Sequence, residues 1–377
     1  MLNTKFVLSA LAGAALLSSA AVAVAGPKIV SGPGAEPACF KPWTDQTKYF
    51  QWDKKPGPYR IAIVNGFVGN TWRIQMIKTA KAYADQPEVK KDIKELKVIS
   101  TGTDVAAQLG AMEDFINQGF DAIVTIAVSP EGFDRVIKLA DKNNVVVVPF
   151  DNVLDTDKVM MVNENQTDLG RIPGEFLMKE IGKKEGKILE VRGLPGNSVD
   201  RDRHVGFRKV MEAEGNKFQI VEVVGNWDDG TAQKVTADAI AVHGKFDGIF
   251  VQGGSTGVVR AMMDAKHPFV PVAGESENGF RKLIVEHQKD GLKGLSLGQS
   301  PGLVAISMKA AISALKGNPM PQLISIPIPG GDYTTLKDGT NYWSNLTDNF
   351  FTTNEFAPCG VNISAPEIMA KDESNSN

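Results

Sequence analysis

A short apolar run, a glycine-containing loop and a helical pattern follow one another over residues 59–81, and this unit constrains the fold more than any other part of the chain. Residues 61–64 (IAIV) have the composition of a buried strand, and apolar residues recur at three-residue spacing from Thr71 onward. A buried strand that leads into a helix in this way is the first half of a βαβ unit. The loop after the strand carries Asn70 and Trp72, so we expect it to form half of a small-molecule site.

The same alternation continues, pauses near residue 160 and then starts again. The first series predicts strands at 61–64, 96–100, 122–126 and 145–150, and helices at 71–85, 104–118 and 132–142. The second predicts strands at 186–191, 218–224, 246–252 and 270–274, and helices at 200–214, 230–243, 256–265 and 278–287. Such alternation is typical of parallel sheets with helices on both faces. We therefore expect an α/β protein with two Rossmann-like lobes, which a hinge joins and which close around a ligand.

The limits of the lobes follow from where the alternation pauses. We assign residues 1–25 to a signal peptide, 26–58 to an irregular arm rich in Pro and Gly, 59–163 plus 301–327 to an N-terminal lobe, and 164–300 plus 328–377 to a C-terminal lobe with an irregular tail. Extended crossings of the chain between the lobes would form the hinge.

The first 25 residues have the pattern of a cleaved signal peptide. Lys5 precedes an apolar run over residues 6–17, and Ala23-Val24-Ala25 fits the small residues that signal peptidase requires, with Gly26 as the new N-terminus. A membrane anchor is the alternative, but the apolar run is short and ends in small residues. We expect export to the periplasm, with no lipid anchor and no membrane insertion after cleavage.

The two cysteines, Cys39 and Cys359, lie outside the strand and helix pattern, one near each end of the mature chain. Export places them in an oxidising compartment, so we expect a disulfide, with two free thiols as the alternative. The His residues are far from both cysteines in sequence and no CxxC or HExxH motif is present, so we expect no metal and no cofactor. A formal net charge of −3 gives no support for a nucleic-acid partner, which requires a basic face.

Polar and aromatic side chains recur in the loops that follow the predicted strands. They include Asn70, Trp72, Asp151, Asn152, residues 197–203, Trp227, Ser255, Glu275 and Gln299. Carboxylate, amide and guanidinium groups each offer several hydrogen bonds, and indole rings cover the C–H faces of sugars. Ordinary loop polarity or packing explains any one of these residues equally well. Their repetition at one end of both sheets favours a site for a polyhydroxylated ligand.

The order of several short motifs resembles the ribose/galactose-type periplasmic sugar-binding proteins of ABC transporters. The motifs are IAIV, GNTW, VVPFDN, NENQTDLG, GLPGNSVDRDRHVGF, NWD, GIFVQGG, PVAGES and LGQSPG, and the resemblance covers roughly residues 59–327. The resemblance implies the type I periplasmic binding protein fold, a sugar or polyol ligand, a membrane permease as partner and no catalytic residue. We also expect a monomer.

The resemblance further implies roles for single residues. The first loop of the family bears an Asn and a stacking aromatic, which match Asn70 and Trp72. The other matches are an acid at Asp151, a second stacking aromatic at Trp227, an acid at Glu275, a Gln at Gln299 and an Arg at Arg203, with Arg201 as the near alternative for that Arg.

Two departures from ribose binders point to a different ligand. Gly253-Gly254 stand where ribose binders have Asn-Asp, and Asn152 stands where they have Arg. Fewer charged contacts and more room suggest another pentose, a hexose or an acyclic polyol. The long tail exceeds that of ribose binders, and Trp343 or Phe350 within it are candidates for additional ligand contacts.

Two other functions fit parts of the sequence. Residues 253–257 (GGSTG) match G-x-S-x-G between a strand and a helix, and Ser255, Glu275 and His287 follow in Ser–acid–His order, as in an exported serine hydrolase. Against it, His287 falls inside a helical pattern, and Ser255 or Thr256 is equally explained as a helix N-cap. Within the binding class, the alternative is a receptor for a furanose-type signal, such as an autoinducer or a chemotaxis ligand.

Overall fold

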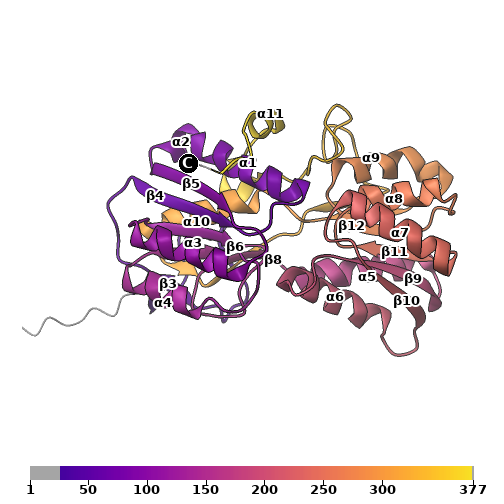
Figure 1. Cartoon of the computed structure of the whole chain (residues 1–377), viewed down its shortest axis with the longest axis horizontal. Coiled ribbons are helices and arrows are strands. Elements are labelled where there is room, and N and C mark those ends of the chain that lie inside the picture. Colours follow the sequence, from indigo (N-terminus) through magenta and orange to yellow (C-terminus); the bar gives the residue numbers. More distant parts are fainter. Residues whose placement is uncertain (1–25, 376–377) are drawn as a thin grey trace, which may run out of the picture.

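Figure 1 shows a computed structural model of the chain, in which residues 26–375 are described; the signal peptide expected at residues 1–25 lies outside them. The described residues form two α/β lobes that lie side by side along the long axis of the molecule (Figure 1). The predicted fold class is therefore confirmed. None of the helices within 26–375 combines the length and the apolar character needed to cross a bilayer.

The N-terminal lobe is built on a parallel sheet with the strand order β5-β4-β6-β7. The strands are β4 (Tyr59–Asn65), β5 (Ile93–Ser100), β6 (Ala122–Ile126) and β7 (Val146–Pro149). The helices α1 (Thr71–Asp85) and α10 (Leu303–Leu315) pack on one face, and α3 (Val105–Asn117) and α4 (Asp134–Lys142) pack on the other, while the short α2 (Pro87–Lys90) follows α1.

Strand β4 shows why an uninterrupted apolar run belongs at the centre of this lobe. Ile61 and Ile63 enter the core beneath α1 and α10, whereas Ala62 and Val64 enter the core beneath α3 and α4. Successive side chains of a strand point to opposite faces of the sheet, so a strand that is covered on both faces must be apolar throughout.

The C-terminal lobe contains a six-stranded sheet with the order β10-β9-β11-β12-β13-β16, in which only β16 is antiparallel. The strands are β9 (Glu185–Arg192), β10 (Lys217–Val224), β11 (Gly248–Val251), β12 (Val272–Glu275), β13 (Gly294–Leu297) and β16 (Gly330–Asp332). One face packs against α5 (Gln166–Ile181) and α6 (Ser198–Met211), and the other against α7 (Asp229–His243), α8 (Ser255–Asp264) and α9 (Asn278–His287), which is followed by the 3-10 turn η1 (Gln288–Asp290).

Both sheets place their first strand, β4 or β9, between the second and the third. The chain therefore reverses its direction of winding beside that strand, and ligands of open α/β sheets bind at such a switch point, outside the carboxyl ends of the strands. Loops 66–70 and 193–197 leave the two first strands at these points. The topology thus directs the ends of both sheets toward one shared site.

The hinge consists of three crossings, which follow β8 (Met161–Glu164), β13 and β15 (Leu323–Ile326). Strands β8 and β15 run parallel, and β2 (Lys41–Pro42) pairs with the other edge of β15. The arm expected to be irregular thus contributes to the hinge. It also forms a second small sheet, in which β3 (Tyr49–Gln51) lies between β1 (Lys28–Val30) and β14 (Met320–Pro321).

The tail after residue 330 does not stay on the C-terminal lobe, where the sequence analysis placed it. After β16, the chain returns to the N-terminal lobe and forms β17 (Glu355–Phe356), η2 (Ala357–Cys359), β18 (Val361–Asn362) and α11 (Ala365–Met369), which packs on α1. Apolar tail residues such as Phe351 and Ile368 enter the core beneath α1 and α10. Cys39 and Cys359 form the expected disulfide there.

Candidate functional site

A cavity of about 330 Å³ lies where the carboxyl ends of the two sheets face each other. Its lining residues come from both lobes and from the hinge: Asn70, Trp72, Arg73, Asp151, Asn152, Val199, Arg203, Trp227, Glu275 and Gln299. The structure therefore brings together every residue of the expected ligand-binding set except Arg201, whereas the tail candidates Trp343 and Phe350 do not line the cavity. It also adds Arg73 and Val199, which the sequence analysis did not single out.

The N-terminal lobe contributes the beginning of α1. Asn70 is the N-cap of this helix, and its Oδ1 accepts a hydrogen bond from the Arg73 N–H at 2.9 Å. The Trp72 indole N–H donates to the Gln299 carbonyl at 3.1 Å, which joins α1 to the hinge crossing after β13. The Arg73 guanidinium donates to Asn65 Oδ1 at 2.7 Å and lies 5.7 Å from the centre of the Trp72 ring. Burial lowers the pKa of Arg73 to about 10, although Asp151 opposes that shift.

Asp151 follows β7 and is held in a conformation that is uncommon for a residue with a side chain. Its φ is +57°, and its Oδ1 is buried with no hydrogen-bond partner among residues 26–375. Burial raises the pKa of Asp151 to about 7, because the attraction of Arg73 and Arg203 only partly offsets the loss of solvent. The neighbouring Asn152 donates from its amide to the Ala127 carbonyl at 3.3 Å.

Arg203, on α6, is the centre of the polar network on the C-terminal lobe. Its Nε donates to Gln166 Oε1 at 2.9 Å and its Nη1 donates to the Gln252 carbonyl at 3.1 Å. The guanidinium also pairs with the carboxylate of Glu275 and donates to Gln299 Oε1. A buried ion pair with this many hydrogen bonds is held in one geometry, because losing any partner would leave a desolvated charge.

Trp227 is seated against the backbone of Gly193. A Cβ atom at position 193 would lie only 2.1 Å from the Trp227 Nε1, so the close approach of the ring requires glycine there. Trp227 itself has a φ of +58°, and its indole N–H is buried without a partner within the described chain. A buried indole N–H usually has a hydrogen-bond acceptor, and this one has none among the described residues.

The structure places Arg201 outside the cavity, which corrects its assignment as a ligand residue. Residues two positions apart on a helix point in different directions, so Arg201 and Arg203 cannot both face the cavity. The Arg201 guanidinium instead forms a two-pronged ion pair with Asp155 of the N-terminal lobe, at 2.6 and 3.0 Å. The Ser198 Oγ also donates to the Val153 carbonyl across the lobes, at 3.2 Å. The two lobes are therefore in direct contact beside the cavity.

Glu164 and Gln166 support the site from the end of β8 and the start of α5, although neither lines the cavity. Gln166 orients the Arg203 guanidinium, as described above. Both carboxyl oxygens of Glu164 are buried without a partner within residues 26–375, and burial raises the pKa of Glu164 well above its usual range. Both residues belong to the sequence motif NENQTDLG, but no pattern in the sequence distinguished them from the surrounding polar residues.

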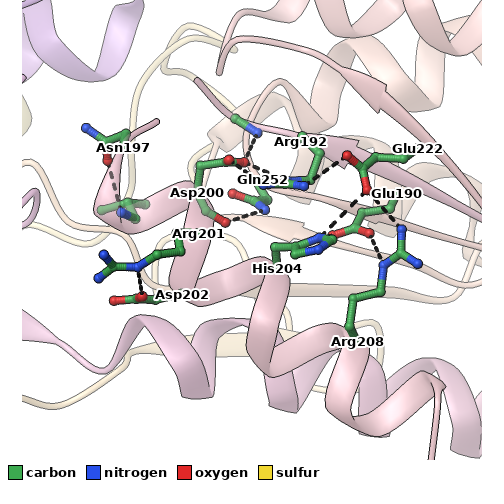
Figure 2. A network of polar contacts seen from close by, with 12 residues as sticks. Glu190, Arg192, Asn197, Asp200, Arg201, Asp202, His204, Arg208, Glu222 and Gln252 are labelled. Carbon is green, nitrogen blue, oxygen red and sulfur yellow. Dashed lines mark hydrogen bonds and ion pairs between the residues drawn. The ribbon is translucent and has the colours of Figure 1, made fainter. Parts of the chain in front are cut away.

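A network of carboxylates and guanidinium groups fixes the other side of α6 to the sheet (Figure 2). Arg208 donates to Glu190 at 2.7 Å and to Glu222 at 2.9 Å, and Arg192 donates to Glu222 at 2.9 Å and to Asp200 at 2.8 Å. The network thereby holds the helix that presents Arg203 to the cavity.

Glu190, Glu222 and His204 also form the one group of potential metal ligands found among the described residues, with ligand atoms within 4.8 Å of one another. His204 Nδ1 lies 2.9 Å from Glu190 Oε1, and the guanidinium groups of Arg192 and Arg208 engage the remaining carboxylate oxygens (Figure 2). Two positive charges beside the ligand atoms disfavour a bound cation, so we interpret the group as structural.

The contacts of Ser255 do not support a hydrolase. Its Oγ is buried and accepts a hydrogen bond from the Glu275 N–H at 3.0 Å. The carboxylate of Glu277 accepts hydrogen bonds from the backbone N–H groups of Gly254, Ser255 and Thr256, and so caps α8. His287 bonds to Asp290 at 2.9 Å, and no hydrogen bond joins it to Ser255 within residues 26–375. Ser255 thus lies at the start of a capped helix rather than in a triad.

Comparison with known proteins identifies relatives of this chain. The chain is 22% identical to the ribose import binding protein of Haemophilus influenzae over 71% of its own length and 89% of the relative. It is 28% identical to the D-ribose/D-allose-binding protein of Pseudomonas aeruginosa over 50% of this chain and 60% of that protein.

Solved structures share the fold. A galactofuranose-binding protein superposes with a TM-score of 0.65 at 20% identity, over 73% of this chain and 95% of that one. A solute-binding protein of Actinobacillus succinogenes with bound D-allose gives a TM-score of 0.63 at 22% identity, over 73% and 97% of the two chains. The model of the periplasmic binding protein domain matches residues 61–319. The chain therefore belongs to the periplasmic binding protein family and has the two-lobed fold of its type I members.

Proposed function

We propose that this chain is an exported solute-binding protein. It captures a neutral monosaccharide or polyol between its lobes in the periplasm and presents it to the permease of an ABC transporter. The observation that carries the proposal is the cavity at the carboxyl ends of both sheets, where the rings of Trp72 and Trp227 meet Asp151, Arg203 and Glu275.

Two buried polar atoms in this cavity match the chemistry of a hydroxyl group. The Trp227 indole N–H is a donor without an acceptor, and Asp151 Oδ1 has no partner within the described residues. A hydroxyl group accepts from one neighbour and donates to another, so the hydroxyls of a sugar or polyol suit both atoms. Buried polar groups are rarely left unpaired, which makes a hydroxylated ligand a better occupant than an apolar one.

The charges of the cavity favour a neutral ligand. Above about pH 7, where Asp151 is ionised, Arg73 and Arg203 are balanced by Asp151 and Glu275, and Arg203 is already paired with Glu275. An ionised ligand would introduce a buried charge without a matching partner, which is costly. We therefore expect sugar phosphates and sugar acids to bind far more weakly than the corresponding neutral sugars.

The relatives support the proposal at the level of ligand class. Their names give ribose, allose and galactofuranose as ligands, and solved neighbours contain bound D-allose, D-fucose and myo-inositol. We propose no chemical step on the ligand, so it should be recovered unchanged.

The test is a thermal-shift screen of the mature protein against pentoses, hexoses, polyols and furanose-type signals, followed by calorimetry on each hit. Saturating ligand should raise the melting temperature through mass action. For the best ligand, Trp227→Ala should weaken binding by about 1–3 kcal/mol, because it removes both the ring and the indole donor. Trp43→Ala is the matched control, since Trp43 belongs to the arm and does not line the cavity.

Equal losses in the two Trp variants would contradict the assignment of the cavity as the binding site. A single hit among furanose-type signals, with none among nutrient sugars and polyols, would favour the receptor over the transport function. Absence of any shift across the panel would overturn the proposed ligand class.

A further inference from the structure

Residues 350–354, which we call the strap, contact both lobes. The strap follows a stretch of tail on the C-terminal lobe and precedes β17 on the N-terminal lobe, so it forms a fourth crossing in addition to the three of the hinge. In Figure 1 this part of the tail is yellow and runs between α9 and α11. It lies beyond residue 319, where the match to the family model ends.

Main-chain hydrogen bonds attach the strap to the C-terminal lobe. The Asn278 N–H donates to the Phe350 carbonyl at 2.8 Å, and the Thr352 N–H donates to the Ser276 carbonyl at 3.1 Å. Just before the strap, Asp348 forms an ion pair with Arg260 of α8 at 2.7 Å. The strap therefore lies alongside the end of β12 and the start of α9.

The strap is attached to the N-terminal lobe by the packing of Phe351 in the core beneath α1 and α10 and by the hydrogen bonds of one side chain, Gln75. Gln75, a buried residue of α1, accepts a hydrogen bond from the Phe351 N–H at 2.8 Å through its Oε1. Its Nε2 donates to the Phe351 carbonyl at 3.0 Å and to Asn354 Oδ1 at 3.1 Å. The Gln75 amide thus pairs with the backbone of the strap in the way that a neighbouring strand would.

Both attachment points lie next to cavity residues. Gln75 is one helical turn beyond Trp72, and Ser276 directly follows Glu275. The Ser300 hydroxyl, next to Gln299 in the hinge, also donates to the Thr353 carbonyl. Beyond the strap, the Cys39–Cys359 disulfide fixes the tail to the N-terminal lobe. The tail is therefore anchored on a different lobe on each side of the strap.

We infer that the strap is a built-in restraint on the opening of the lobes, and that Gln75 is the residue through which it acts. Opening moves α1 away from β12 and α9, and the strap is hydrogen-bonded to both sides. The movement must therefore either break the hydrogen bonds of Gln75 and withdraw Phe351 from the core beneath α1, or detach the strap from β12. The disulfide prevents the tail from following the C-terminal lobe outward. The restraint acts without a ligand, so it is independent of which ligand the cavity takes.

The experiment measures the distance between the lobes in the mature protein without ligand. Spin labels are introduced as noncanonical amino acids at Lys138 in α4 and at Val242 in α7, which are exposed on opposite lobes. Pulsed dipolar spectroscopy should give one narrow distance distribution for the wild type. Gln75→Ala should add a population at distances longer by about 2 Å or more, the scale of a hinge motion. Reduction of the wild-type disulfide should broaden the distribution in the same direction.

Gln86→Ala is the matched control. Gln86 also joins the region of α1 to the tail, through a hydrogen bond to the Asn362 carbonyl at 3.2 Å, but that contact lies within the N-terminal lobe. The control should retain the wild-type distribution. An unchanged distribution in Gln75→Ala, or an equal change in Gln86→Ala, would overturn the inference. If Gln75→Ala does not fold, Asn354→Ala removes one of the same contacts and is judged by the same outcomes.

Discussion

The ionised form of Asp151 is disfavoured relative to that of a surface aspartate, because the carboxyl group is buried. Its backbone is in the left-handed region and one carboxyl oxygen has no partner within the described chain. Two arginines attract the carboxylate, yet burial still raises the pKa of Asp151 to about 7. Such strain and unpaired polarity are typical of sites where binding, rather than stability, determines the residue.

The pH dependence of stability follows from this pKa. The folded protein retains a proton on Asp151 that the unfolded chain releases near pH 4, so the unfolded state binds fewer protons between about pH 4 and pH 7. The free energy of unfolding should therefore fall as the pH rises through that window. Asp151→Asn should be as stable as the wild type near pH 4 and more stable by roughly 1–4 kcal/mol near pH 8, with weaker ligand binding.

Urea unfolding of the ligand-free protein at several pH values measures this difference. Part of the slope should persist in the variant, because burial also raises the pKa of Glu164 and raises that of Glu277 to about 8. A wild-type slope that Asp151→Asn leaves unchanged would show that Asp151 does not hold the proton.

Arg201 gives a second prediction, since Asp155 and Asp202 are its only charged partners within residues 26–375. Both members of its ion pair with Asp155 are substantially exposed, and exposed pairs contribute about 0.2–1 kcal/mol. Arg201→Ala should weaken ligand binding by no more than that, through a less stable closed arrangement, and the loss should shrink at high salt. Calorimetry on Arg201→Ala, Asp155→Ala and the double variant tests this, because the two losses should not add. Additive losses, or a loss above about 1 kcal/mol that resists salt, would restore Arg201 as a ligand contact.

At the residue scale, the sequence predicted the cavity residues at strand ends better than the cavity residues on helices. Asp151 and Trp227 follow strands and Glu275 ends one, and the carboxyl ends of parallel strands meet at one edge of a sheet regardless of how the helices are oriented. Arg73 was missed because an arginine in the first turn of a helix is typical of a solvated face. Arg201 was misplaced because the direction of a helical side chain depends on where the helix begins, and α6 begins two residues before the predicted start.

Helices α5 and α6 approach each other closely enough to exclude a side chain from the contact. A Cβ atom on Gly170 would lie 1.9 Å from the Arg203 carbonyl, and one on Gly206 would lie 2.0 Å from the Thr167 carbonyl. The contact brings Gln166 at the start of α5 within hydrogen-bonding distance of Arg203. The two glycines therefore determine where Arg203 lies.

Gly206→Ala should separate these helices. The added methyl group meets backbone atoms that cannot move aside, so we expect a loss of about 1–3 kcal/mol in the free energy of unfolding. Ligand binding should weaken as well, because Arg203 moves with α6. Gly110→Ala is the control: this glycine lies inside α3 with no atom within 4 Å of the added Cβ, so the variant should gain about 0.5–1 kcal/mol. Equal melting temperatures for the two variants would contradict the close packing.

The regular elements were predictable because their patterns are local. Periodicity identified most strands and helices of the two lobes, including the apolar run of β7, but not β16, which lies in the tail that was expected to be irregular. The arm and the tail were not predictable in this way, because their short strands form only by pairing with distant segments, as β3 does with β14 and β2 with β15. No period within residues 26–58 or 330–375 reveals such a partner.

At the scale of the whole molecule, the disulfide joins residues separated by 320 positions and ties the arm to the tail. Closing so long a loop restricts the unfolded chain strongly, so removal should cost about 2–5 kcal/mol. Thermal unfolding with and without reductant measures the loss, and both cysteines of the chain are in this bond, so reductant has no other thiol target. A Cys39→Ser, Cys359→Ser double variant should match the reduced wild type and be insensitive to reductant. An unchanged melting temperature in both would show that the packed core beneath α1 suffices without the bond.

The two lobes are built from different segments of the chain, and this affects the order in which they can fold. Most of the C-terminal lobe comes from one continuous stretch, residues 164–300, whereas the N-terminal lobe needs residues 59–163, α10 and the segment after residue 350. During the export proposed above, the lobe that begins first would therefore be completed only when the last residues arrive. Its apolar surfaces stay exposed until then. We therefore expect periplasmic chaperones to act on the N-terminal lobe rather than on the C-terminal lobe.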